Sequence, residues 1–189
     1  MASSASQEIF DAGNLPDGTG MEIAVVTADW NPEITGALRE ACLYTLVECG
    51  VPESSITSVS VPGAYELPMG AKLLLDHRLP DAVICLGCII KGETRHDEFI
   101  ASAISNRILD LGLLADTPII FGVLTTENEE QAKDRAGGKH GNKGVESAIT
   151  AVRMVALARD LAESSNTFVL DDDLEDLFGE DEDEPDSDL

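Results

Sequence analysis

The chain has 189 residues and a mass of 20.1 kDa, enough for one domain with a sizeable hydrophobic core and short tails. Its formal net charge is −24, which argues against nucleic acid or an anionic membrane surface as its main partner. No apolar run approaches the roughly 20 residues that span a bilayer. The N-terminal sequence lacks the basic start and apolar core of a secretory signal, so we expect a cytoplasmic protein.

The acidic residues are unevenly distributed. Twelve of the 36 lie in residues 171–189, which contain no Lys or Arg, yet the rest of the chain is still acidic. Solubility and adaptation to high salt both stay open as explanations for the acidic body. The composition predicts a mobile arm over residues 1–20, one folded domain over 21–163 and a disordered acidic tail over 164–189.

The chain contains four cysteines, none with a His at the spacing of metal ligands, so we expect no zinc or other metal site. Cys85 and Cys88 lie in an apolar run, which is typical of small core residues. Reduced thiols are the expected state in the cytoplasm.

Hydrophobic periodicity predicts strands that alternate with amphipathic helices. The predicted strands occupy residues 23–26, 56–61, 82–90 and 119–124. The predicted helices occupy residues 34–49, 67–75, 99–111, 128–136 and 145–161. Residues 137–144 are predicted to form a loop. Apolar strands in this order indicate an α/β fold with a parallel sheet in a three-layer α/β/α sandwich.

Ligands of such folds bind outside the carboxyl ends of the strands, which directs attention to four loops. These loops occupy residues 28–31, 61–66, 90–96 and 124–128. In the first, Trp30 could stack on a planar heterocycle, but the pattern alone favours a Trp that covers a helix end. In the second, Glu66 could be a carboxylate that is electrostatically favourable at the start of its helix, or it could accept hydrogen bonds from ligand hydroxyls, and neither interpretation is favoured.

The third loop combines a flexible glycine with polar residues that precede a helix. Backbone N–H groups of Glu93 and Thr94, after Gly92, are typical of an anion site. His96 can exchange protons near neutral pH, although a solvated His on the first helical turn fits the same pattern.

A basic segment at residues 133–143 stands out in this acidic chain. It contains Arg135, whose guanidinium suits bidentate phosphate recognition, among several glycines that favour this interpretation. The alternative is a solvated face, with Glu129 and Lys133 as an ordinary helical ion pair. Neither a Walker motif nor a Gly-x-Gly-x-x-Gly fingerprint is present in the sequence.

Five motifs in this order carry a resemblance to a known family. They are Trp30-Asn31, the Gly-Ala-Tyr-Glu-Leu-Pro of residues 63–68, the Gly-Cys-Ile-Ile-Lys-Gly-Glu-Thr-Arg-His of 87–96, the Phe-Gly-Val-Leu-Thr-Thr-Glu-Asn of 121–128, and residues 131–144. Over roughly residues 21–160 the chain resembles the 6,7-dimethyl-8-ribityllumazine synthase family. The departures are mild: Trp30 replaces a common Phe, Cys88 a common Thr, and Asp97-Glu98 a frequently aromatic pair.

The resemblance implies a flavodoxin-like sheet and an enzyme of riboflavin biosynthesis that needs neither metal nor organic cofactor. Its two small-molecule substrates would be 5-amino-6-(D-ribitylamino)uracil and 3,4-dihydroxy-2-butanone 4-phosphate, and His96 would transfer protons. The residues implied to bind substrate are Trp30, Ala64, Tyr65, Glu66, Cys88, Ile89, Ile90, Phe121 and Lys143. Those implied to bind phosphate are Glu93, Thr94 and Arg135.

The resemblance also implies a homo-oligomer with active sites between subunits. The compact segment 137–142 favours an icosahedral 60-mer, with a pentamer as runner-up, and residues 8–12 could add a strand to a neighbour's sheet. In the acidic tail, an apolar stripe at Leu170, Leu174, Leu177 and Phe178 could dock a pathway enzyme, although a solubilising tail is favoured. The competing functions are a lumazine-dismutating enzyme of the same pathway, a non-catalytic flavin or lumazine binder, and a structural shell protein.

Overall fold

The computed structural model describes residues 16–170, with side chains up to residue 164. By its internal contacts the chain divides into a first unit, Met1–Ala156, and a second, Leu157–Leu189. Predictions for residues 1–15 and 171–189 lie outside the described residues. No helix in the described part is long and apolar enough to cross a membrane.

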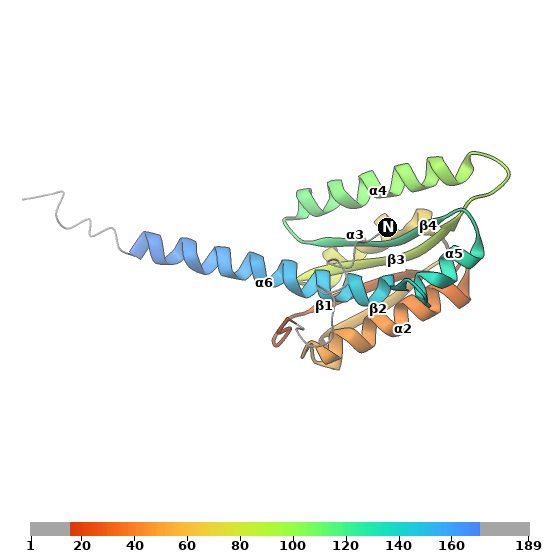
Figure 1. Cartoon of the computed structure of the whole chain (residues 1–189). Coiled ribbons are helices and arrows are strands. Elements are labelled where there is room, and N and C mark those ends of the chain that lie inside the picture. The colour runs from red at the N-terminus through yellow and green to blue at the C-terminus, as the bar shows by residue number, and fades with distance from the viewer. Residues whose placement is uncertain (1–15, 171–189) are drawn as a thin grey trace, which may run out of the picture. The chain divides into compact units, whose positions relative to one another are not determined.

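The first unit is built on a four-stranded parallel sheet with strand order β2-β1-β3-β4 (Figure 1). Its strands are β1 (Ile23–Ala28), β2 (Ile56–Val61), β3 (Ala82–Ile90) and β4 (Ile119–Thr126). Every residue of β1 and the first seven of β3 are buried, because these central strands are covered on both faces. The predicted parallel sheet and three-layer α/β/α sandwich are confirmed.

Helices cover both faces of this sheet. They are α2 (Pro32–Glu48), α3 (Leu67–Arg78), α4 (His96–Ala115), α5 (Glu129–Asp134) and α6 (Lys143–Leu170). Short 3-10 turns lie at Glu53–Ser55 and Ala64–Glu66. The helices α2 and α5 and the part of α6 within the first unit pack on one face, whereas α3 and α4 pack on the other.

Alternation along β1 explains the two cores. Ile23 and Val25 join the cluster with α2 and α6, while Ala24 and Val26 join the cluster with α3 and α4. Successive side chains of a strand point to opposite faces, so one continuous apolar run supplies both clusters. The carboxyl ends of the parallel strands then meet at one edge, which brings the predicted loops together.

The structure differs from the predicted elements around residues 137–144. A small hairpin, β5 (Ala136–Gly138) and β6 (Gly141–Asn142), replaces the predicted loop. Gly137 and Gly141 have φ of 118° and 79°, which few other residues adopt, and these glycines close the hairpin. These short strands consist of alanine, glycine and asparagine and have no hydrophobic alternation, so periodicity could not predict them.

Candidate active site

A cleft of about 940 Å³ lies at the carboxyl ends of β2, β1 and β3, against the first half of α4. Nine of the predicted site residues line it: Trp30, Ala64, Tyr65, Glu66, Cys88, Ile89, Ile90, Thr94 and His96. They come from the carboxyl end of β3 and from the segments that follow β1, β2 and β3, which are far apart in the sequence, and the parallel sheet brings them together.

Trp30 forms part of the cleft wall and is 69% exposed. Its backbone N–H donates to the carbonyl of Pro62, and the preceding Asp29 N–H donates to the carbonyl of Val61. A Cβ atom built on Gly63 would lie 3.7 Å from the indole Cδ2, so the ring sits beside Gly63. An indole this exposed offers a face on which a planar ligand can stack, and that role stays a prediction.

Glu66 ends the 3-10 turn that precedes α3. Its Oε2 accepts a hydrogen bond from the backbone N–H of Gly63 at 3.0 Å, which caps the 3-10 turn, and its carboxylate lies at the start of α3 as predicted. The same residue lines the cleft, and a carboxylate has acceptor capacity beyond this one bond. Capping and ligand binding are therefore compatible.

The end of β3 supplies an uncharged floor. Cys88 is 5% exposed, and burial raises the pKa of its thiol to about 11, so it is protonated at neutral pH. Ile89 and Ile90 are half-buried beside it. All four cysteines are free and buried, and we find no group of three or more His, Cys, Asp or Glu within residues 16–170 placed to hold a metal.

The loop after β3 leads directly into α4. His96 is the first residue of that helix and Thr94 precedes it, and both line the cleft, whereas Glu93 does not. Within residues 16–170 the backbone N–H groups of Glu93 and Thr94 form no hydrogen bond. They are thus available to an anion, and the anion site itself stays a prediction.

Sequence reasoning missed several lining residues, among them Asn31, Phe99 and Ala103. Phe99 follows His96 by three positions and therefore lies on the same helix face, a signal that was available in the sequence. Arg95 also packs its guanidinium 5.7 Å from the Phe99 ring centroid. Asn31 adopts φ 59° and ψ 56°, a left-handed backbone conformation that no sequence motif predicted.

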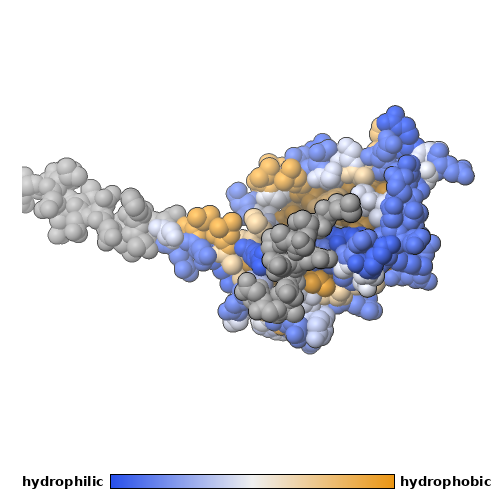
Figure 2. Space-filling view, in the orientation of Figure 1, coloured by the Kyte–Doolittle hydropathy of each residue, from blue (hydrophilic) through white to orange (hydrophobic). Residues whose placement is uncertain are grey.

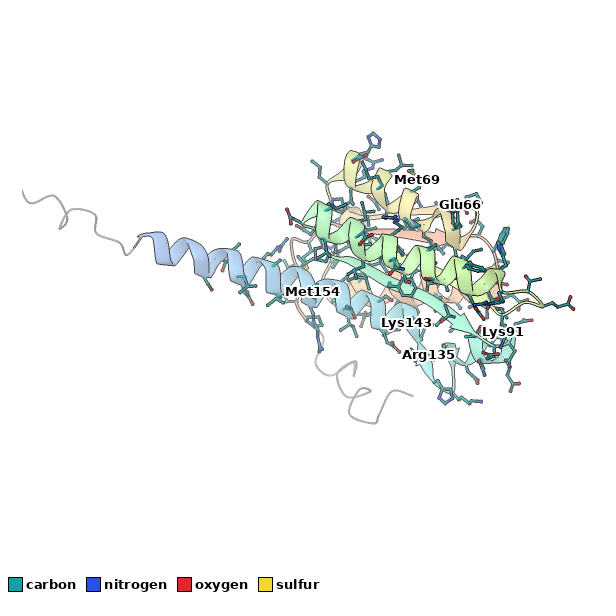
Figure 3. All side chains as sticks on the ribbon, turned by 90° about the horizontal axis from the view of Figure 1, so that it is seen from above. Glu66, Met69, Lys91, Arg135, Lys143 and Met154 are labelled. Atoms are coloured by element: carbon teal, nitrogen blue, oxygen red, sulfur yellow. The ribbon has the colours of Figure 1, made fainter. Side chains whose placement is uncertain are left out.

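The structure separates Arg135, Lys143 and Phe121 from this cleft. None of the three lines it within the described chain, and Figure 3 places Glu66 on one side of α4 and both cations on the other. Phe121 lies on the edge strand β4 and packs partly against the α3 and α4 core. The predicted site is therefore divided between two regions of one chain.

Arg135 and Lys143 meet at a common carboxylate. Glu146 Oε1 lies 2.7 Å from Arg135 Nη2, and its Oε2 lies 3.2 Å from Lys143 Nζ. Arg135 Nη1 also donates to the carbonyl of His140 at 2.5 Å, which ties the guanidinium to the hairpin. We call Arg135, Lys143 and Glu146 the cation cluster. Glu146 is an acid that the sequence analysis did not single out.

The other lysines of the basic segment make ordinary ion pairs. Lys133 Nζ lies 2.7 Å from Glu129 Oε1, which confirms the predicted helical pair, and Lys139 Nζ lies 2.7 Å from Asp134 Oδ2. The hydrogen bonds of these pairs raise the pKa of both lysines. The solvated-face interpretation thus fits Lys133 and Lys139. Among the cations of the basic segment, Arg135 and Lys143 in the cation cluster stay the predicted phosphate ligands.

Comparison with known proteins agrees with this geometry. The family profile of 6,7-dimethyl-8-ribityllumazine synthase matches residues 20–159. The 6,7-dimethyl-8-ribityllumazine synthase of Cytophaga hutchinsonii is 50% identical over 145 residues, which cover 77% of this chain and 91% of the relative. That of Parabacteroides distasonis is 44% identical over 146 residues, or 77% of this chain and 91% of the relative. The chain therefore belongs to the 6,7-dimethyl-8-ribityllumazine synthase family.

Proposed function

We propose that this chain is a transferase that condenses 5-amino-6-(D-ribitylamino)uracil with 3,4-dihydroxy-2-butanone 4-phosphate to 6,7-dimethyl-8-ribityllumazine. The observation that carries the proposal is one cleft that combines an exposed indole, a carboxylate and a histidine in a chain of this family. The reaction is the penultimate step of riboflavin biosynthesis.

The substrate amine attacks the ketone, and loss of water gives an imine. Elimination of inorganic phosphate and ring closure with loss of a second water complete the product. These steps need positioned reactants, an anion site and a proton carrier. In this proposal the cleft residues position the reactants and His96 is the proton carrier. The backbone N–H groups of Glu93 and Thr94 and the cations of the cation cluster together form the anion site.

The family resemblance implies the roles of the residues, and the positions of the lining residues in the cleft support them. Trp30 stacks on the pyrimidine ring, while Ala64, Tyr65 and Glu66 hold the ribityl chain. Cys88, Ile89 and Ile90 line the ring pocket, and a protonated thiol at Cys88 keeps that pocket uncharged. His96 moves the protons at the reacting nitrogen and oxygen atoms.

The anion site combines backbone and side-chain donors. Glu93 and Thr94 offer backbone N–H groups to the phosphate, and Arg135 supplies the charge. Lys143 supports the anion region, and Phe121 reaches a neighbouring subunit's site.

In a homo-oligomer with active sites between subunits, the two separate regions of the predicted site can come together from neighbouring subunits. In this arrangement the cation cluster and Phe121 of one subunit complete the cleft of its neighbour. Exposed apolar side chains support such contacts, and Figure 2 shows hydrophobic surface near the C-terminal end of α4 and between α4 and the sheet. Apart from Trp30 in the cleft wall, the most exposed of them among the described residues are Leu79, Leu113, Leu114, Tyr44 and Phe99.

We favour a 60-mer of twelve pentamers over a free pentamer, because the hairpin of residues 136–142 is compact. The edge strand β2 leaves one side unpaired among the described strands, and residues 8–12 of a neighbour could pair there. Light scattering that finds only a five-chain species would contradict the 60-mer. Strong acidity opposes assembly at low salt, so the measurement needs a salt series.

We place the enzyme in the cytoplasm and retain two functions for its acidic tail, solubility and docking of a pathway enzyme. Leu174, Leu177 and Phe178 lie outside the described residues. Deletion of residues 166–189 that leaves turnover unchanged but removes a co-purifying partner would favour docking. Replacing these three residues with Ser should mimic the deletion at constant charge.

One assay tests the proposed reaction. Purified protein is mixed with both substrates, and lumazine is followed by absorbance and fluorescence. A lumazine-dismutating enzyme would consume lumazine, a non-catalytic binder would only hold it, and a shell protein would do neither. Absence of lumazine formation from correctly assembled protein would overturn the proposal.

A further inference from the structure

Asn31 occupies the N-cap of α2 without capping it. A typical N-cap Asn has extended backbone and accepts from an N–H of the first turn, as Asn128 does at α5, where Oδ1 accepts from Gln131 N at 2.9 Å. Asn31 instead has φ 59° and ψ 56°, and its side chain makes no cap hydrogen bond. It also precedes Pro32, which disfavours helical backbone in the residue before it. The local structure therefore forgoes a favourable cap.

The side-chain amide of Asn31 is used elsewhere. Its Nδ2 donates to the carbonyl of Cys88 at 3.2 Å, 57 residues away in the sequence. The backbone pairing of β1 with β3 ends at Thr27 and Leu86, so this amide extends the connection between the two strands past the end of the ladder. Left-handed backbone is the conformation that brings the amide there, and Asn tolerates it better than most residues.

This bond lies next to the only tryptophan of the chain. Towards β2, Trp30 is held by its own N–H on Pro62 and by the Asp29 N–H on Val61. Towards β3, the Asn31 amide is the side-chain hydrogen bond that joins this turn to the cleft floor. Because the indole is largely exposed, side-chain burial contributes little to its placement and the anchors on both sides decide it.

We propose that Asn31 is a positioning residue, which holds Trp30 on the cleft wall through its hydrogen bond to Cys88 so that the indole face meets the planar substrate. The identity of that substrate, the pyrimidine, rests on the proposed function. Asn31 acts through Trp30 and not on the reacting atoms. Its loss weakens binding of the pyrimidine more than it lowers kcat.

Three variants separate the side chain of Asn31 from its backbone. Asn31→Asp keeps the size and the tolerance of left-handed backbone but removes the donor. Asn31→Gly adopts the same φ without strain and removes the amide. Asn31→Ala loses both features. Asn128→Asp is the matched control, because the bond there uses the amide oxygen, which a carboxylate retains.

The first measurement is time-resolved fluorescence anisotropy of the assembled, substrate-free protein, in which Trp30 is the only indole. Asn31→Asp and Asn31→Gly should both enlarge the fast depolarisation that reports local motion, and Asn128→Asp should not. Wild-type anisotropy in Asn31→Gly would mean that the backbone conformation suffices, and it would overturn the proposal. This measurement needs no catalysis, so it stays informative if no lumazine is formed.

The second measurement is substrate affinity. Asn31→Asp should raise the Kd for the pyrimidine by about three- to tenfold, the worth of one hydrogen bond, and leave the KM of the phosphorylated ketone unchanged. In a Trp30→Ala background the same substitution should change the Kd less than about twofold. An undiminished effect in that background would mean that Asn31 contacts the ligand directly, which contradicts the proposal.

Discussion

The cleft and the cation cluster differ in how much charge their side chains carry. The cleft is formed by side chains and backbone groups at three strand ends, and its floor at Cys88, Ile89 and Ile90 is uncharged. The cation cluster is fully charged, and its two cations are already paired with Glu146. A flat ring can be bound by shape and backbone donors, whereas a phosphate needs positive charge. Positive charge in turn needs a counter-charge when no ligand is bound.

The side chains of the cation cluster are more buried than those of an ordinary surface ion pair. The side chains of Arg135, Glu146 and Lys143 are 29%, 20% and 31% exposed, whereas those of the helical pair Lys72 and Asp76 are 51% and 46% exposed. Partly buried charges are screened less by water and salt, so the cluster is a stronger electrostatic unit than the surface pairs. The comparison teaches that this chain places its neutral cleft floor and its paired cations in separate regions of the fold.

The largest expected effect falls on the cleft. His96→Ala should lower kcat by about 10²–10⁴-fold, because a proton carrier is lost while positioning of both substrates remains. Steady-state kinetics on protein with unchanged assembly and circular dichroism measure this effect. Wild-type turnover would remove His96 from the mechanism.

The cation cluster should respond differently to the loss of its arginine. Arg135→Ala should raise the KM of the phosphorylated ketone by about 10–100-fold, the worth of a charge-assisted contact, and alter pyrimidine binding far less. Titration of each substrate separately checks this. An equal loss of binding affinity for both substrates would mean that Arg135 is not specific for the phosphorylated ketone.

Glu146→Gln tests whether the counter-charge tunes the anion site. Without the carboxylate, Arg135 and Lys143 repel each other, so inorganic phosphate should inhibit at several-fold lower concentration and the free energy of unfolding should fall by about 1–3 kcal/mol. Glu129→Gln is the control, because that exposed helical pair with Lys133 should change stability by less than about 0.5 kcal/mol. Equal effects of the two variants would argue against a special role for Glu146.

The smallest effect concerns the neutral floor of the cleft. Burial raises the pKa of the Cys88 thiol from 9.0 to about 11, so the folded state holds its proton more tightly than the unfolded state. The resulting stability is fully present below pH 9 and is lost as the pH rises towards 11. Chemical unfolding across this range should show the decline, and Cys88→Ala should make it shallower. An identical slope in the variant would mean that the thiol is not protected by burial.

The cleft was predictable from the sequence to a large extent. Apolar runs predicted the strands, and the parallel topology then placed residues such as Glu66 and His96 at one edge of the sheet. Glycine, proline and helix-start signals fixed the loops because they act locally. Apolar periodicity marked α4 only from residue 99, because a polar first turn carries no such periodicity, whereas the loop motif already suggested that His96 lies on the first turn, where the structure has it.

By itself, then, the sequence determined the alternation of strands and helices, the polar loops that end the strands and the family motifs within them. These properties depend on the chemistry of neighbouring residues, which the sequence states directly. The tertiary structure alone decided that Asn31 donates to Cys88, that Glu146 joins Arg135 to Lys143, and that these cations lie away from the cleft. Such pairings join residues that only the folded chain brings together, and their geometry depends on backbone angles and packing that no local pattern encodes.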